Sequence, residues 1–171
     1  VSVDWSSIEA NLRIVRGSEV YRNGYTGAGY RIGVLDTGVR SNDPSLAGRV
    51  DASLTYTDAT ANDLSVADWS GHGTLVAQIA GGIAPAPGSG GAAPGSSIVS
   101  GRIVADSTPW DGGLVTGGEL LGSIGVKQIL EDMASRDVRI VNASWGGLRR
   151  NGDNETTLIG NEYWPFIYEH G

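Results

Sequence analysis

Two short segments of the sequence combine residue types that can move protons. Asp36 ends an apolar run and is followed by Thr-Gly, while His72 lies between two glycines where a helix-like pattern begins. A carboxylate beside an imidazole favours the protonated ring, whereas a helix N-terminus disfavours it. The two influences offset each other and would leave the pKa of the imidazole near neutral pH, which suits a general base. Each residue also has an ordinary explanation, since an aspartate can cap a turn and a lone histidine can be an unremarkable polar group.

Metal and thiol chemistry are not favoured by the residue types present. The other histidine, His170, is distant from His72 in sequence, and no pair of histidines has the spacing of metal ligands. The chain contains no cysteine, which excludes disulfides, thiol catalysis and cysteine-zinc sites. We therefore expect no metal site and no cofactor among these residues.

The apolar patterns predict strands that alternate with helices. Such alternation predicts an α/β fold with a doubly wound, mostly parallel sheet and helices on both faces. Residues 1–29 have a mixed, turn-rich pattern, and residues 39–69 are polar with no regular period. The predicted strands are 30–35, 98–104 and 138–144, and the predicted helices are 72–80, 116–135 and 161–170.

This topology would bring distant polar residues together. In parallel α/β sheets, ligands bind at the carboxyl ends of the strands, and the helices that follow strands begin at the same edge. Asp36 and Ser144 each end a predicted strand, and His72 begins a predicted helix. We therefore expect all three to face one crevice.

Composition narrows the classes of protein that this chain can represent. Its 171 residues favour one domain, with 40% apolar and 18% charged residues. A net charge of −7 without a basic run disfavours nucleic-acid binding. No stretch approaches the roughly 20 apolar residues of a membrane span, so none is expected.

Several motifs occur in an order that resembles one family, the subtilisin-like serine proteases or subtilases. Residues 24–39 (GYTGAGYRIGVLDTGV) are similar to the aspartate motif, and residues 71–77 (GHGTLVA) to the histidine motif. Residues 92–94 (AAP) are similar to a segment before the next strand, and residues 141–147 (VNASWGG) to the substrate-binding strand. The resemblance implies that Asp36 orients His72 and that His72 accepts the proton of a serine nucleophile.

The resemblance also implies where a polypeptide substrate would bind. An extended peptide would add as a strand to the backbone of Ser144, Trp145 and Gly146. The stretch Gly112, Gly113 and Leu114 would flank the peptide from its other side. Trp145 would either wall a side-chain pocket or simply pack in the core.

Two family features are missing from the sequence. No motif of the kind that carries the nucleophilic serine is present, and neither is the segment with the oxyanion-hole asparagine. We therefore expect residues 1–171 to be the N-terminal part of one peptidase domain, inactive alone. The complementary C-terminal part would be a second chain or adjoining sequence. Ser45 replaces a frequent calcium-binding aspartate, so calcium is conceivable but no strong site is expected.

Other functions remain open at the level of sequence. A subtilase relative that binds peptides without cleaving them would also lack the serine. An aspartic protease would use Asp36-Thr37-Gly38, but it needs two such aspartates, and the chain has one such motif. A nucleotide site is disfavoured because Gly24, Gly27 and Gly29 precede a strand rather than follow it. The family's habit of export leads us to expect a bacterial protein that is secreted or displayed on the cell surface.

Overall fold

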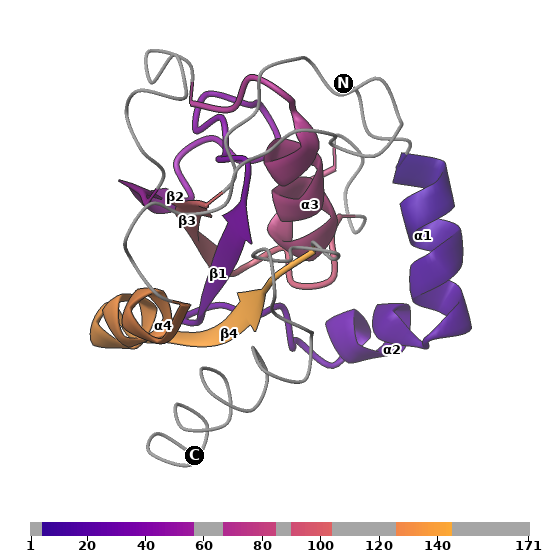
Figure 1. Cartoon of the computed structure of the whole chain (residues 1–171). Helices are drawn as coiled ribbons and strands as arrows, with labels where there is room; N and C mark the ends of the chain where they lie inside the picture. The colour runs from indigo at the N-terminus through magenta and orange to yellow at the C-terminus, as the bar shows by residue number, and fades with distance from the viewer. Residues whose placement is uncertain (1–4, 57–66, 85–89, 104–125, 145–171) are drawn as a thin grey trace, which may run out of the picture.

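The computed structural model describes residues 5–56, 67–84, 90–103 and 126–144, which build a 4-stranded sheet (Figure 1). The spatial order of the strands is β2-β3-β1-β4, and all adjacent strands are parallel. The predicted α/β fold with a parallel sheet is therefore confirmed. The strands are β1 (Arg31–Asp36), β2 (Val50–Thr55), β3 (Ser97–Arg102) and β4 (Val138–Asn142).

Helices cover both faces of the sheet, as the sequence predicted. Successive side chains of a strand point to opposite faces. Ile32 and Val34 of β1 therefore lie in the same core cluster as Ala77 of α3 (His72–Gly81). Leu35 faces the other way and packs with Met133 of α4 (Val126–Ser135). Figure 1 shows the two helices on opposite sides of β1.

The two helical crossovers of this sheet have opposite hands. The connection through α3 leads from β2 to β3, and the connection through α4 leads from β3 to β4. Both connections move in the same direction across the strand order, yet the helices lie on opposite faces. One crossover must therefore be left-handed, which is rare because strand twist favours the right-handed form.

The expectation of a turn-rich N-terminal segment was wrong for much of its described part. The chain instead forms α1 (Trp5–Ile14) and α2 (Gly17–Arg22). Ile8 and Leu12 are spaced four residues apart on α1, and Arg13 pairs with Glu9 at the same spacing. Such i, i+4 pairs stabilise a helix only weakly. This short pattern was therefore easy to overlook beside the turn residues that follow it.

The polar region from residue 39 to residue 69 was also misread, because it contains the strand β2. Val50, Ala52 and Leu54 alternate along β2 with more exposed residues. This alternation with period two is the usual signal of a half-buried strand. β2 pairs only with β3, so it is an edge strand among the described residues. Its alternate residues are therefore only half-buried, and the apolar signal is weak.

Parts of the sequence prediction lie outside the described residues. These are the helix at 161–170, the start of the helix at 116–135 and the last residue of the strand at 98–104. The predicted strand at 138–144 ends two residues earlier, as β4. Within the described ranges, no helix combines the length and apolar character needed to cross a membrane.

Candidate active site

The central strand β1 delivers Asp36 to the carboxyl edge of the sheet. β1 pairs with β3 on one side and with β4 on the other, and every residue after Arg31 is buried. Oδ1 of Asp36 accepts a hydrogen bond of 2.8 Å from the backbone N–H of Thr37. Its other oxygen, Oδ2, is buried and has no hydrogen-bond partner among the described residues. The sheet thus holds a carboxylate at a fixed position with one oxygen uncommitted.

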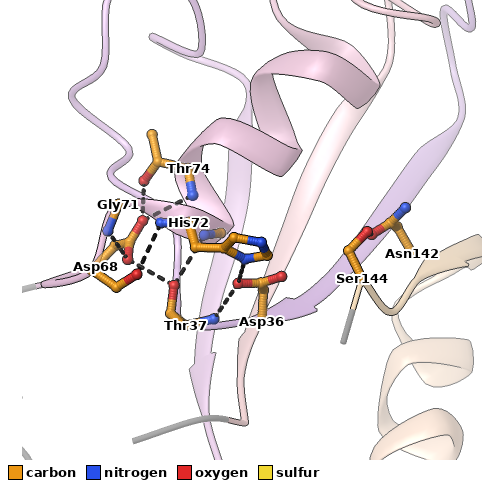
Figure 2. A network of polar contacts seen from close by, with 10 residues as sticks. Asp36, Thr37, Asp68, Gly71, His72, Thr74, Asn142 and Ser144 are labelled. Carbon is orange, nitrogen blue, oxygen red and sulfur yellow. Dashed lines mark hydrogen bonds and ion pairs between the residues drawn. The ribbon is translucent and has the colours of Figure 1, made fainter. Parts of the chain in front are cut away.

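His72 is the first residue of α3 and lies against this carboxylate. Its Nδ1 is 2.7 Å from Asp36 Oδ1, and the imidazole side chain is 24% exposed whereas the Asp36 side chain is 3% exposed (Figure 2). Because the carboxylate is an acceptor, the Nδ1–H donates to it in the neutral ring. The second ring nitrogen, Nε2, is then the atom that can take up a proton.

The surroundings of His72 favour its protonated form. The hydrogen bond to Asp36 raises the pKa of His72 above its ordinary value of 6.5, and partial burial opposes this. The negative charges of Asp36 and Asp68 raise the same pKa further. The sequence predicted that the carboxylate and the helix N-terminus would offset each other, but in the structure the carboxylates have the larger effect and raise the pKa of His72.

Two glycines allow α3 to start this close to the end of β1. A Cβ atom on Gly73 would lie 2.1 Å from the Gly38 carbonyl oxygen and 3.2 Å from Asp36 Oδ1. Gly38 itself has a φ of 110°, which side-chain-bearing residues rarely adopt. The Asp36–His72 contact therefore depends on the absence of side chains at both positions.

Asp68 is a buried site residue that the sequence reasoning missed. It lies four residues before His72, and its carboxylate accepts hydrogen bonds from the N–H groups of Gly71 and Thr74, each at 2.8 Å. Thr37, which follows Asp36, also donates its hydroxyl to Asp68 at 2.8 Å (Figure 2). The N-cap position of α3 is Gly71, three residues after Asp68, so the usual capping signal did not point to Asp68.

The predicted substrate-binding residues are only partly described. Ser144 is exposed just beyond β4, and its hydroxyl donates to Asn142 Oδ1 at 2.6 Å. Asn142 is level with Val34 in the parallel pairing, so Ser144 lies at the same edge of the sheet as Asp36 (Figure 2). The remaining predicted contacts lie outside the described residues: Gly112, Gly113, Leu114, Trp145 and Gly146.

The segment around Ser45 makes protein hydrogen bonds. Asp43 Oδ1 accepts from the Ser45 hydroxyl at 2.6 Å and from Gln78 Nε2 at 2.9 Å. Burial raises the pKa of Asp43, but these hydrogen bonds outweigh it and the pKa is lowered. Within the described part of the chain, no group of three or more His, Cys, Asp or Glu side chains could hold a metal ion.

Comparison with known proteins identifies the family. The model of the subtilase family matches residues 27–163, which include the Asp36–His72 contact and the whole described sheet. The chain belongs to the subtilase family. Thermitase of Thermoactinomyces vulgaris is 39% identical over 82 residues, which are 47% of this chain and 28% of thermitase. The major intracellular serine protease of Bacillus subtilis (strain 168) is 26% identical over 76 residues, 44% of this chain and 24% of that protein.

Solved structures support the same fold for this subtilase chain. The MycP3 protease from the type VII (ESX-3) secretion system superposes with a TM-score of 0.58 at 24% identity, covering 93% of this chain and 42% of that one. MycP1 without its N-terminal propeptide gives a TM-score of 0.52 at 26% identity, over 94% and 44% of the two chains. The chain thus matches less than half the length of each of these relatives.

Proposed function

We propose that this subtilase is a serine endopeptidase in which Asp36 and His72 are two members of an Asp-His-Ser triad. The observation that carries the proposal is the 2.7 Å contact between Asp36 Oδ1 and His72 Nδ1 at the carboxyl edge of the sheet. The nucleophilic serine would be supplied by sequence outside residues 1–171. A buried carboxylate behind a half-buried imidazole is the arrangement that such a triad requires.

The proposed chemistry follows from the two nitrogens of His72. With Nδ1–H held by Asp36, Nε2 would accept the proton of the serine hydroxyl as its oxygen attacks the peptide carbonyl carbon. Asp36 would stabilise the imidazolium that forms. His72 would then return the proton to the leaving amine, and a water molecule activated in the same way would release the acyl group. Asp36 would orient and polarise the His72 ring, and it would not take the proton itself.

The peptide would bind along the end of β4. We propose that Ser144, Trp145 and Gly146 offer backbone groups to an extended substrate, with Gly112, Gly113 and Leu114 on its other side. The exposure of Ser144 at the edge that also carries Asp36 supports this orientation. The residues beyond Ser144 would then set the preference for substrate side chains.

A complementary C-terminal part of the domain is proposed to complete the sheet. β4 pairs with β1 on one side only within the described residues, and Ile140 and Val141 are exposed. An unpaired strand with exposed apolar residues favours addition of further strands. This part would carry the serine and the oxyanion-hole group, either as adjoining sequence or as a second chain.

We further propose that the protein acts outside the bacterial cytoplasm, secreted or at the cell surface. The basis of this proposal is the family resemblance, since many subtilases are exported; the major intracellular serine protease of Bacillus subtilis is a relative named for the opposite location. Fractionation of cells that express the complete protein would test it. Recovery only with the cytoplasm would contradict the proposed location but not the proposed chemistry.

The test of the proposed function is covalent labelling of the complete protein with a fluorophosphonate, followed by denaturing mass spectrometry. We expect a single adduct on a serine outside residues 1–171, and we expect His72→Ala to slow the labelling strongly because the serine is no longer activated. Heat-denatured protein is the control for nonspecific reaction. A folded complete protein that binds peptides but takes no label would point to a peptide-binding subtilase without catalysis.

A further inference from the structure

Asp68 is the most completely buried carboxylate beside the candidate site, with 0% of its surface exposed. Both of its oxygens are committed. Oδ1 accepts from the Gly71 N–H and the Thr37 hydroxyl, and Oδ2 accepts from the Thr74 N–H, each at 2.8 Å. The Thr74 hydroxyl is a further donor to Oδ2. One side chain thus collects donors from the start of α3 and from the segment after β1.

Thr37 joins this carboxylate to Asp36. Its hydroxyl donates to Asp68 and accepts the Gly73 N–H at 3.0 Å, while its backbone N–H donates to Asp36 Oδ1. Asp36 and His72 are therefore linked in two ways, by their direct contact and by the path through Thr37 and Asp68. The second path fixes the backbone on both sides of the imidazole.

We propose that Asp68 is a positioning residue of this site, which holds the N-terminus of α3 and thereby keeps the His72 ring against Asp36. Asp68 is fully buried and accepts hydrogen bonds from backbone N–H groups and threonine hydroxyls. It would therefore act on the reaction only through His72. The kinetic part of this inference rests on the proposed protease function, whereas its structural part does not.

The charge of Asp68 provides a signature that a purely structural role would lack. The charged groups that act on the pKa of His72 are the Asp36 and Asp68 carboxylates, and two arginines lie beside these aspartates. Arg40 donates from Nε to the Asp68 backbone carbonyl at 2.9 Å, and Arg102 is buried at the end of β3, level with Asp36. The Asp68 charge raises the pKa of His72. Removing that charge should therefore lower the pKa of His72.

A second aspartate offers a matched control. Asp43 is half-buried rather than fully buried, and it is also bonded to α3, but through Gln78, six residues beyond His72 along the helix. Asp43→Asn should weaken the attachment of α3 to the fold as Asp68→Asn does, without reaching the imidazole. A difference between the two variants therefore separates positioning from general stabilisation.

The experiment compares Asp68→Asn and Asp43→Asn in the complete protein. Both oxygens of Asp68 accept hydrogen bonds, but asparagine has only one side-chain oxygen. Its NH2 group would therefore face N–H and O–H donors that it cannot accept from. For Asp68→Asn we expect kcat to fall by about 10- to 100-fold through misplacement of the ring, with KM within about twofold. The acid limb of the pH profile should move to lower pH. Asp43→Asn should change neither kcat nor the pH profile.

A measurement without turnover separates this inference from the proposed function. The His72 pKa can be followed by NMR titration of its ring resonances, assigned by comparison with a His72→Gln variant. A lower His72 pKa in both Asp68→Asn and Thr37→Val, the second of which keeps the Asp68 charge, with no change in Asp43→Asn, supports the proposal even in a protein that hydrolyses nothing. Unchanged kcat and an unchanged His72 pKa in folded Asp68→Asn would overturn it.

If Asp68→Asn does not fold, Thr37 provides a second test. Thr37→Val removes the bridging hydroxyl at nearly constant volume and leaves the Asp68 charge in place. We expect a reduced kcat in Thr37→Val and its recovery in Thr37→Ser, which restores the hydroxyl. Equal kcat values for the valine and serine variants would contradict the proposed path.

Discussion

β1 and β4 are adjacent parallel strands of one sheet, but their surroundings differ sharply. β1 has a hydrogen-bonded neighbour on each side and is buried from its second residue to its last. β4 has one neighbour among the described strands, and Ile140 on it is 56% exposed. The strand that carries Asp36 is therefore complete within this structure, whereas the strand that leads to Ser144 still has an open edge and an uncovered apolar side chain.

This difference separates the two halves of the proposed function. The groups proposed to move protons are held by contacts present among the described residues, including the hydrogen bonds around Asp36 and His72. The groups proposed to bind substrate follow the less covered strand. The Asp36–His72 geometry is therefore complete among the described residues, whereas the substrate edge is proposed to depend on further strands.

The largest expected effect comes from removing the imidazole of His72, which lies against Asp36 at the end of the fully paired strand β1. In the complete protein, His72→Ala should reduce kcat for a peptide substrate by about 10⁴-fold or more, because no group would accept the proton of the serine. Steady-state hydrolysis of a chromogenic peptide measures this. Arg13→Ala, on the exposed surface of α1, is the control and should retain activity. Near-normal turnover without His72 would refute the triad assignment.

A smaller but still large effect is expected at the junction of α3 with β1. Gly73→Ala would place a Cβ atom 2.1 Å from the Gly38 carbonyl oxygen, so α3 and the His72 ring must shift. A misplacement of about 1 Å can cost about 100-fold in rate, and we expect a loss of that size in kcat/KM. Gly48→Ala is a useful comparison, since nothing lies within 4 Å of its added Cβ and only its positive φ is strained. Equal losses in both variants would contradict this prediction, because an added Cβ at Gly48 meets no neighbouring atom.

The open side of β4 can be tested by stability. Leu35→Ala, in the buried core of β1, should lower the free energy of unfolding by about 2–5 kcal/mol. Ile140→Ala should cost below about 0.5 kcal/mol if the side chain stays exposed. If further strands cover β4 in the complete protein, we expect Ile140→Ala to approach the cost of Leu35→Ala there. Denaturant unfolding of both variants measures the difference, and a negligible Ile140→Ala effect in the complete protein would argue against a covering segment.

The smallest expected effect concerns pH. His72 must be neutral to act as a base, and its pKa is raised above 6.5, first by the hydrogen bond to Asp36. The rate kcat/KM should therefore fall as pH decreases through a midpoint above 6.5. The His72–Asp36 contact should stabilise the fold most at low pH, below the unfolded-state pKa, and this contribution should be lost as pH rises through the folded-state value. A pH–rate profile with its acid midpoint below 6.5 would contradict the raised pKa.

Several elements of the fold were predictable because their sequence signals are local. The apolar run before Asp36 predicted β1, and the spaced apolar residues after His72 predicted α3. α1, α2 and β2 were missed because their apolar residues are few and half-exposed. Their stability depends on modest packing that leaves only a weak periodic pattern.

The candidate site was predictable only in part. Residue types and strand ends indicated that Asp36 and His72 would meet, since both belong to the carboxyl edge of a parallel sheet. Asp68 was not recognised, because its importance comes from donors on Thr37, Gly71 and Thr74. No local pattern reports that one carboxylate will collect donors from two separate segments.

By itself, the sequence determined the alternation of strands and helices, the family motifs and the choice of Asp36 and His72. These follow from short-range periodicity and residue chemistry. Only the tertiary structure decided the order β2-β3-β1-β4, the opposite hands of the two crossovers and the 2.7 Å contact itself. Such features depend on how both faces of the sheet are covered and on a glycine that admits α3 against Gly38. They arise from packing between distant segments, which no single stretch of sequence encodes.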